Sequence, residues 1–147
     1  NIGLRSEERG LHLNWIIEAA GAQISSVGPF TFAGGMRAET PLAPVHLRGV
    51  RRAEGVHLTW VRRGRIGADG WDAADIALDE DLERYRVDIL AGTVVRRTME
   101  VAQPSCLYAT SDEIADFGAA QTTLSFQVRQ LGRAVPLGIA ATGTLSL

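Results

Sequence analysis

The sequence contains no lysine, and all 15 of its basic residues are arginine. Because 17 acidic residues outnumber them, the formal net charge is −2, and the chain has no overall positive field that would attract nucleic acid or an anionic membrane surface. We therefore predict no direct nucleic-acid binding. Arginine suits phosphate and carboxylate ligands, but a bias that extends over the whole chain is better explained by a GC-rich coding genome than by a binding site.

Cysteine is almost absent, since Cys106 is the single one. No disulfide can form within this chain, so the fold must be stabilised by burial of apolar side chains. No histidine lies near Cys106 in the sequence, and no family signature surrounds it. These two observations favour a buried, inert thiol over a nucleophile.

Long apolar runs are also missing. No stretch approaches the roughly 18 residues that a membrane-spanning helix needs, and the N-terminus lacks a basic region followed by an apolar one. We predict no membrane span and no signal peptide. The chain begins at Asn1, without a methionine and inside patterned sequence, so we expect it to be a segment of a longer polypeptide.

The familiar catalytic motifs are absent as well. The sequence has no G-x-S-x-G elbow, H-E-x-x-H helix, glycine-rich phosphate loop or Cys-x-x-Cys pair. The acidic residues between positions 69 and 83 do not match the spacing of a calcium loop. We therefore predict that the chain is not an enzyme and holds no cofactor and no metal, and we expect its function to depend on its surfaces.

What the sequence does contain, from Val45 onward, is a repeated alternation of apolar and polar residues, which is typical of half-buried β-strands. The apolar positions include Trp60, Tyr85 and Phe126, which we expect in the core. Residues 111–118 interrupt the alternation as a polar corner, and residues 64–82 read as a long loop. The pattern predicts strands at residues 45–51, 56–63, 85–90, 94–101, 107–109, 122–131 and 139–147.

About seven strands in about 100 residues predict an all-β fold, namely a sandwich of the fibronectin type III or immunoglobulin-like kind. Two prolines, Pro41 and Pro44, mark the predicted domain boundary, because they favour an extended connector. We expect residues 1–40 to be the closing β segment of a preceding domain, 41–44 a proline linker and 45–147 the sandwich. Residues 11–18 fit both strand and helix periodicity, and the glycines and proline around them favour strands.

Several segments together resemble one family. They are residues 41–48 (Pro-Leu-Ala-Pro-Val-His-Leu-Arg), 60–66 (Trp-Val-Arg-Arg-Gly-Arg-Ile), Trp71, 85–87 (Tyr-Arg-Val), 116–118 (Asp-Phe-Gly) and 128–131 (Val-Arg-Gln-Leu). This set resembles the C-terminal region of the large tail-tip proteins of alphaproteobacterial gene transfer agents and related siphophages, which are also called host-specificity or megatron proteins. The resemblance spans residues 41–147. The glycine-rich segment Gly64-Arg65 followed by Gly67-Ala68-Asp69-Gly70 departs from the more polar pattern of the family, which counts against a specific binding role for that loop.

The resemblance implies a structural component of a DNA-delivery particle, located where the tail meets the envelope of the recipient cell. Such a protein is assembled in the cytoplasm and acts outside the cell. The implied partners are other tail-tip or baseplate subunits and a cell-surface polysaccharide or receptor. The resemblance also implies a homotrimer, with three copies around the tail axis.

The candidate binding surface consists of Arg62, Arg63, Arg65 and Trp71. Guanidinium groups beside an indole suit acidic sugars, phosphates or the carboxylates of a partner. Alternation puts Arg62 and Arg63 on opposite faces, so solvated or rim-packing arginines are the alternative, and the small contribution of most exposed charges favours it. Trp71 also leaves a second function open, a carbohydrate-binding module attached to an envelope-degrading enzyme.

Overall fold

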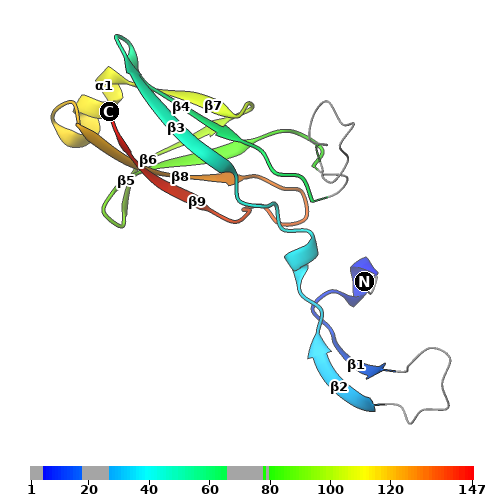
Figure 1. Cartoon of the computed structure of the whole chain (residues 1–147). Helices are drawn as coiled ribbons and strands as arrows, with labels where there is room; N and C mark the ends of the chain where they lie inside the picture. The colour runs from blue at the N-terminus through cyan, green and yellow to red at the C-terminus, as the bar shows by residue number, and fades with distance from the viewer. Residues whose placement is uncertain (1–4, 18–26, 66–77, 79) are drawn as a thin grey trace. The chain divides into compact units, whose positions relative to one another are not determined.

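The computed structural model describes residues 5–17, 27–65, 78 and 80–147. By its internal contacts the chain divides into two compact units, residues 1–39 and 40–147. The first unit holds a hairpin and the second holds two stacked sheets (Figure 1).

The first unit is built around an antiparallel hairpin of β1 (His12–Ile17) and β2 (Val27–Ala33). Short 3₁₀ helices, η1 (Ser6–Glu8) and η2 (Met36–Ala38), lie before and after it. Of the two periodicities that fit residues 11–18, the structure selects the strand for the described part. Trp15 stacks on Phe32 across the hairpin, with ring centroids 5.0 Å apart, and its indole N–H donates to the Phe32 carbonyl oxygen at 3.3 Å.

The second unit contains two antiparallel sheets. The three-stranded sheet has the order β3-β4-β7, and the four-stranded sheet has the order β6-β5-β8-β9. Figure 1 shows the two sheets as separate layers. The strands are β3 (Val45–Arg52), β4 (Gly55–Val61), β5 (Tyr85–Ala91), β6 (Val94–Val101), β7 (Ser105–Ala109), β8 (Thr123–Gln130) and β9 (Ala141–Ser146). The predicted all-β sandwich of the fibronectin type III or immunoglobulin-like kind is therefore confirmed.

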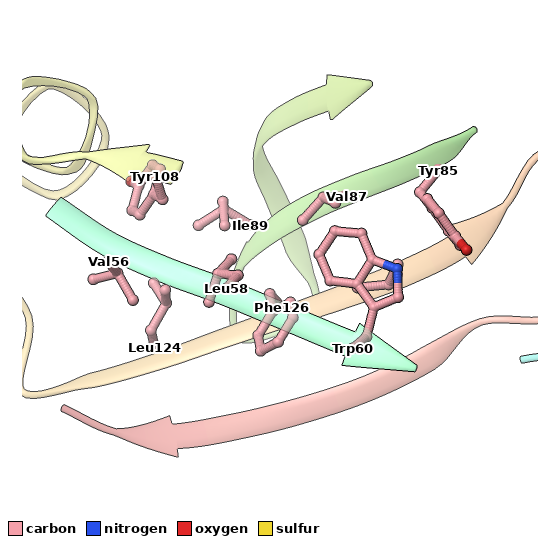
Figure 2. Close-up of a cluster of buried hydrophobic side chains, with 10 residues drawn as sticks. Val56, Leu58, Trp60, Tyr85, Val87, Ile89, Tyr108, Leu124 and Phe126 are labelled. Carbon is pink, nitrogen blue, oxygen red and sulfur yellow. The ribbon is translucent and has the colours of Figure 1, made fainter. Parts of the chain in front are cut away.

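The core lies between the two sheets, where alternate side chains of β4, β5 and β8 meet (Figure 2). Trp60 is 4% exposed, and its ring meets that of Tyr85 edge-on at 5.2 Å. The prediction that Trp60, Tyr85 and Phe126 belong to the core is confirmed. The buried side chains that form this core cluster are Val56, Leu58, Trp60, Tyr85, Val87, Ile89, Tyr108, Leu124, Phe126 and Val128.

Two glycines allow close packing, one within the three-stranded sheet and one between the two sheets. Gly55 begins β4 with φ +148°, and a Cβ on it would overlap the Tyr108 carbonyl oxygen of the neighbouring strand β7. Gly49 lies on the inner face of β3, where a Cβ would overlap the side chain of Leu145 from β9. The absence of a side chain at Gly49 lets β3 and β9 pack together where the two sheets meet.

The predicted polar corner at 111–118 is wrong, because this segment forms a helix, α1 (Thr110–Phe117). Gly118 ends the helix in the left-handed conformation, and its N–H donates to the Ile114 carbonyl oxygen at 2.8 Å. Ser and Asp favour turns in the absence of tertiary contacts. Here the buried Glu113 carboxylate contacts Arg51 of β3 and so holds the helix against the sheet. A spacing of apolar residues in the sequence does not indicate this contact, because Glu113 is charged.

The segment 41–44 packs within the second unit. Pro41 is fully buried, and its carbonyl oxygen accepts a hydrogen bond from the Ile139 N–H at 3.0 Å. Residues 41–44 thus belong structurally to the sandwich, although the sequence suggests a linker. Ile139 itself is 48% exposed and precedes β9, so the predicted last strand begins too early.

Candidate functional site

The candidate arginines Arg62, Arg63 and Arg65 follow directly after β4, at the end of the sandwich where β5 begins and β8 ends. Trp71, the fourth predicted member, lies outside the described residues. Alternation would place Arg62 on the inner side after Trp60 unless the strand ends there, and β4 ends at Val61. The Arg62 side chain is 12% exposed.

Arg62 forms an ion pair with Glu83, with Nη1 and Oε2 3.1 Å apart. The other oxygen of the same carboxylate, Oε1, accepts a hydrogen bond from the Tyr85 hydroxyl at 2.6 Å. Burial, and then this contact with Glu83, raise the pKa of Tyr85 far above its usual value, so the phenol stays protonated as the donor. Glu83 therefore joins the arginine to the aromatic pair Trp60 and Tyr85 at the rim of the core.

Arg65 forms a second ion pair, with its Nη2 2.6 Å from Glu80 Oε1. The side chains are 17% and 6% exposed, respectively. The other oxygen of Glu80 accepts the backbone N–H of Arg133 at 2.9 Å. Glu80 thus connects the chain after β4 to the connection between β8 and β9. In both ion pairs the arginine holds chain segments together.

Arg63 is exposed, as is Arg133, whose side chain is 77% exposed and lies 3.4 Å from Asp81. An open pocket of about 160 Å³ lies beside Arg133. Its volume is below the several hundred Å³ of a typical small-molecule site. The pocket is lined by Glu80, Asp81, Leu82, Arg84, Leu131, Gly132 and Arg133. Of the three candidate arginines, Arg63 is therefore the one that this end of the sandwich presents to solvent.

The opposite end holds ion pairs that sequence reasoning missed. Arg51 Nη1 and Nη2 donate to the two oxygens of Glu113 at 2.9 and 2.8 Å, and Nη2 also donates to the Gln121 carbonyl oxygen at 2.7 Å. Glu113 is fully buried and accepts the Gln121 N–H at 2.8 Å. The Arg51 hydrogen bonds hold the pKa of Glu113 below its usual value. One carboxylate therefore anchors α1 to β3 and to the segment that precedes β8.

Asp116, three residues further along α1, has the same role toward β6. It accepts two hydrogen bonds from Arg97, at 2.7 and 3.1 Å, and one from the Tyr108 hydroxyl at 2.8 Å. Arg97 is the main cause of a lowered Asp116 pKa. The spacing of Glu113 and Asp116 places both on one helix face. Together with Gly118 as a helix stop, that spacing was the signal available in the sequence.

A third polar cluster lies on the outer face of the four-stranded sheet. Asp88 is 2% exposed and accepts hydrogen bonds from Thr98 at 2.6 Å, from Arg86 at 2.9 Å and from Gln127 at 2.9 Å. Burial opposes ionisation of Asp88, but these three donors outweigh it and lower the pKa. The cluster cross-links β5, β6 and β8.

Cys106 is partly buried in β7, and burial raises the pKa of its thiol to about 11. A thiol with this pKa is protonated near neutral pH and is a poor nucleophile. Among the residues that the structure describes, no group of three or more His, Cys, Asp or Glu side chains is placed to hold a metal. In the same part of the chain, no helix has the length and apolar character to cross a membrane.

The comparisons with known proteins establish the fold alone. No family model matches the chain, and no curated protein matches it. A solved structure that is similar is the rat CD45 extracellular region, domains d3–d4, with a TM-score of 0.52 and 10% sequence identity. The match covers 100% of this chain and 69% of that one.

Proposed function

We propose that this chain is a structural and adhesive module of a phage-like tail tip, where it contacts other tail subunits or the surface of the recipient cell. The observation that carries the proposal is the resemblance of residues 41–147 to the C-terminal region of gene-transfer-agent tail-tip proteins. The fold is compatible with this role, since the described polar clusters hold the strands and loops of the sandwich together.

Within this proposal, the adhesive surface is the end of the sandwich that carries Arg63 and Arg133. Both side chains are exposed and project from neighbouring connections that Glu80 holds together. Guanidinium groups of this kind bind the carboxylates of acidic sugars or of a protein partner. Arg62 and Arg65 hold the chain segments at this end of the sandwich together through their ion pairs with Glu83 and Glu80.

Two particle variants test the proposal. Deleting residues 40–147 removes the whole second unit, and we expect particles whose tips lack density in electron microscopy and that fail to adsorb to recipient cells. Normal tips with normal adsorption would refute the tail-tip function. The double variant Arg63→Glu and Arg133→Glu keeps the fold, and we expect adsorption to fall by about tenfold, which corresponds to about 1.4 kcal/mol.

Arg48→Glu is the matched control, because Arg48 is also exposed but lies on β3. Normal adsorption of the double variant, together with failure of the deletion, would leave the tail-tip function standing and remove the adhesive role of this end.

A further inference from the structure

The hairpin of the first unit has one face made entirely of apolar side chains. The register pairs Leu13 with Phe32 and Trp15 with Phe30, and after a register shift between Trp15 and Ile17 it pairs Ile17 with Val27. Paired residues in an antiparallel ribbon lie on the same face. We call this the apolar hairpin face. It consists of Leu13, Trp15, Ile17, Val27, Phe30 and Phe32.

The opposite face of the hairpin is mainly polar. His12 and Asn14 lie there on β1, and the Thr31 hydroxyl donates to the Asn14 side-chain oxygen at 2.7 Å. Ile16 is the apolar exception on this side of β1. The hairpin thus has one face suited to water and one face suited to packing, like a strand pair at the surface of a larger sandwich.

The apolar hairpin face is largely exposed within this chain. Ile17 is 62% exposed, Val27 55%, Phe32 49% and Phe30 46%, while Leu13 and Trp15 are partly buried. A two-stranded hairpin is at best marginally stable on its own, because it has no second layer against which to pack. An uncharged apolar patch of this kind marks an interaction site.

The size of the face fits a second copy of the same chain. Large side chains that are about half exposed leave ~100 Å² each, so the face exposes about 500 Å². A stable interface buries about 800 Å² per partner, of which about 60% is apolar, or about 500 Å². The face carries no charge that would repel an identical face, so a two-fold axis can bring two copies together through one kind of surface.

We propose that two copies of this chain pair through the apolar hairpin face, so that β1 and β2 of one copy pack on β1 and β2 of the other as a small four-stranded sandwich. Two sheets that pack face to face lie about 10 Å apart with their side chains interdigitated. Trp15 and Phe32, already stacked at 5.0 Å, would form the centre of the interface, where large aromatic residues contribute most. This pairing does not depend on the tail-tip function.

The test is the mass of the intact chain in solution, measured by light scattering and sedimentation over a wide range of concentrations. We expect a dimer that dissociates on dilution. Ile17→Thr combined with Phe30→Thr keeps good strand formers but removes two exposed apolar contacts, and we expect it to weaken the dimer by about 100-fold or more. Ile16→Thr is the matched control on the opposite face and should dimerise as the parent chain does.

Three results would overturn the proposal. A parent chain that is monomeric at every concentration excludes pairing through the apolar hairpin face. A dimer that persists in the double variant means that another surface makes it. A trimer that the double variant dissociates excludes two-fold pairing, in favour of the three copies that the family resemblance implies.

Discussion

The hairpin of the first unit and the sandwich of the second carry the same alternation of apolar and polar residues, but they differ in what happens to the apolar side chains. In the sandwich, Phe126 on β8 is fully buried between two sheets. In the hairpin, Phe30 on β2 is 46% exposed. Alternation therefore specifies a face, and only a second layer turns that face into a core.

The largest expected effect comes from truncating the two phenylalanines in turn. Phe126→Ala removes a fully buried ring, and we expect it to lower the free energy of unfolding by about 3–5 kcal/mol. Phe30→Ala should lower the stability of the sandwich by less than about 0.5 kcal/mol, because Phe30 belongs to the other unit. Denaturant unfolding of the intact chain measures both. Equal losses would abolish the distinction between the two units.

The next effect concerns the ion pair that anchors α1 to the sandwich. Arg51→Met leaves the fully buried Glu113 carboxylate without its guanidinium partner, and we expect a loss of about 3 kcal/mol, seen as a lower melting temperature. The double variant Arg51→Met, Glu113→Leu should recover most of this loss, since no buried charge remains. If Arg51→Met has the same melting temperature as the parent chain, the ion pair does not stabilise the fold.

Acid should weaken the sandwich through three carboxylates that accept hydrogen bonds in the folded state. The pKa values of Glu113, Asp116 and Asp88 are lowered in the folded state from 4.5, 3.8 and 3.8. The unfolded chain binds these protons first, so the stabilisation is fully present above about pH 5 and is lost as the pH falls below about 4 through the folded pKa values. Urea unfolding from pH 6 to pH 3 should show a falling midpoint, with a shallower fall for Asp116→Asn. A constant midpoint would contradict this origin of stability.

The smallest effect separates supporting from exposed arginines at the other end of the sandwich. Arg65→Met breaks the pair with Glu80, and we expect a loss of about 1–2 kcal/mol. Arg63→Met should change stability by less than about 0.5 kcal/mol, because Arg63 is exposed. The melting temperatures of the two variants, each compared with that of the parent chain, measure the two losses. A greater loss for Arg63→Met would reverse the roles assigned to the two arginines.

The sequence was sufficient to predict the sandwich because its core residues lie at every second position of strands. Trp60, Tyr85 and Phe126 are examples, and each is buried as predicted. The sequence was insufficient to predict α1. The residue that anchors this helix is the charged Glu113, so the spacing of apolar residues does not indicate which side of the helix is buried. Helical spacing of acidic residues before a glycine is a weaker signal that could have pointed to it.

The candidate arginines show a second limit of sequence reasoning. Whether an arginine binds a partner or packs internally depends on its nearest carboxylate, and Glu83 and Glu80 lie 21 and 15 positions away from Arg62 and Arg65. Alternation of apolar and polar residues does not indicate that the segment carrying Glu83 lies beside Arg62. The exposure of the apolar hairpin face could not be predicted from the sequence either. The alternation of apolar and polar residues in β1 is the same whether or not a second layer covers the strand.

Hydrogen exchange of the backbone amides, measured on the intact chain at several concentrations, tests the contrast between the two units most directly. We expect the sandwich strands β5 and β8 to be protected equally at all concentrations. Protection of β1 and β2 should rise with concentration, because their second layer comes from another copy. Hairpin amides that are protected to the same extent at every dilution, or that exchange freely at every concentration, would contradict this account.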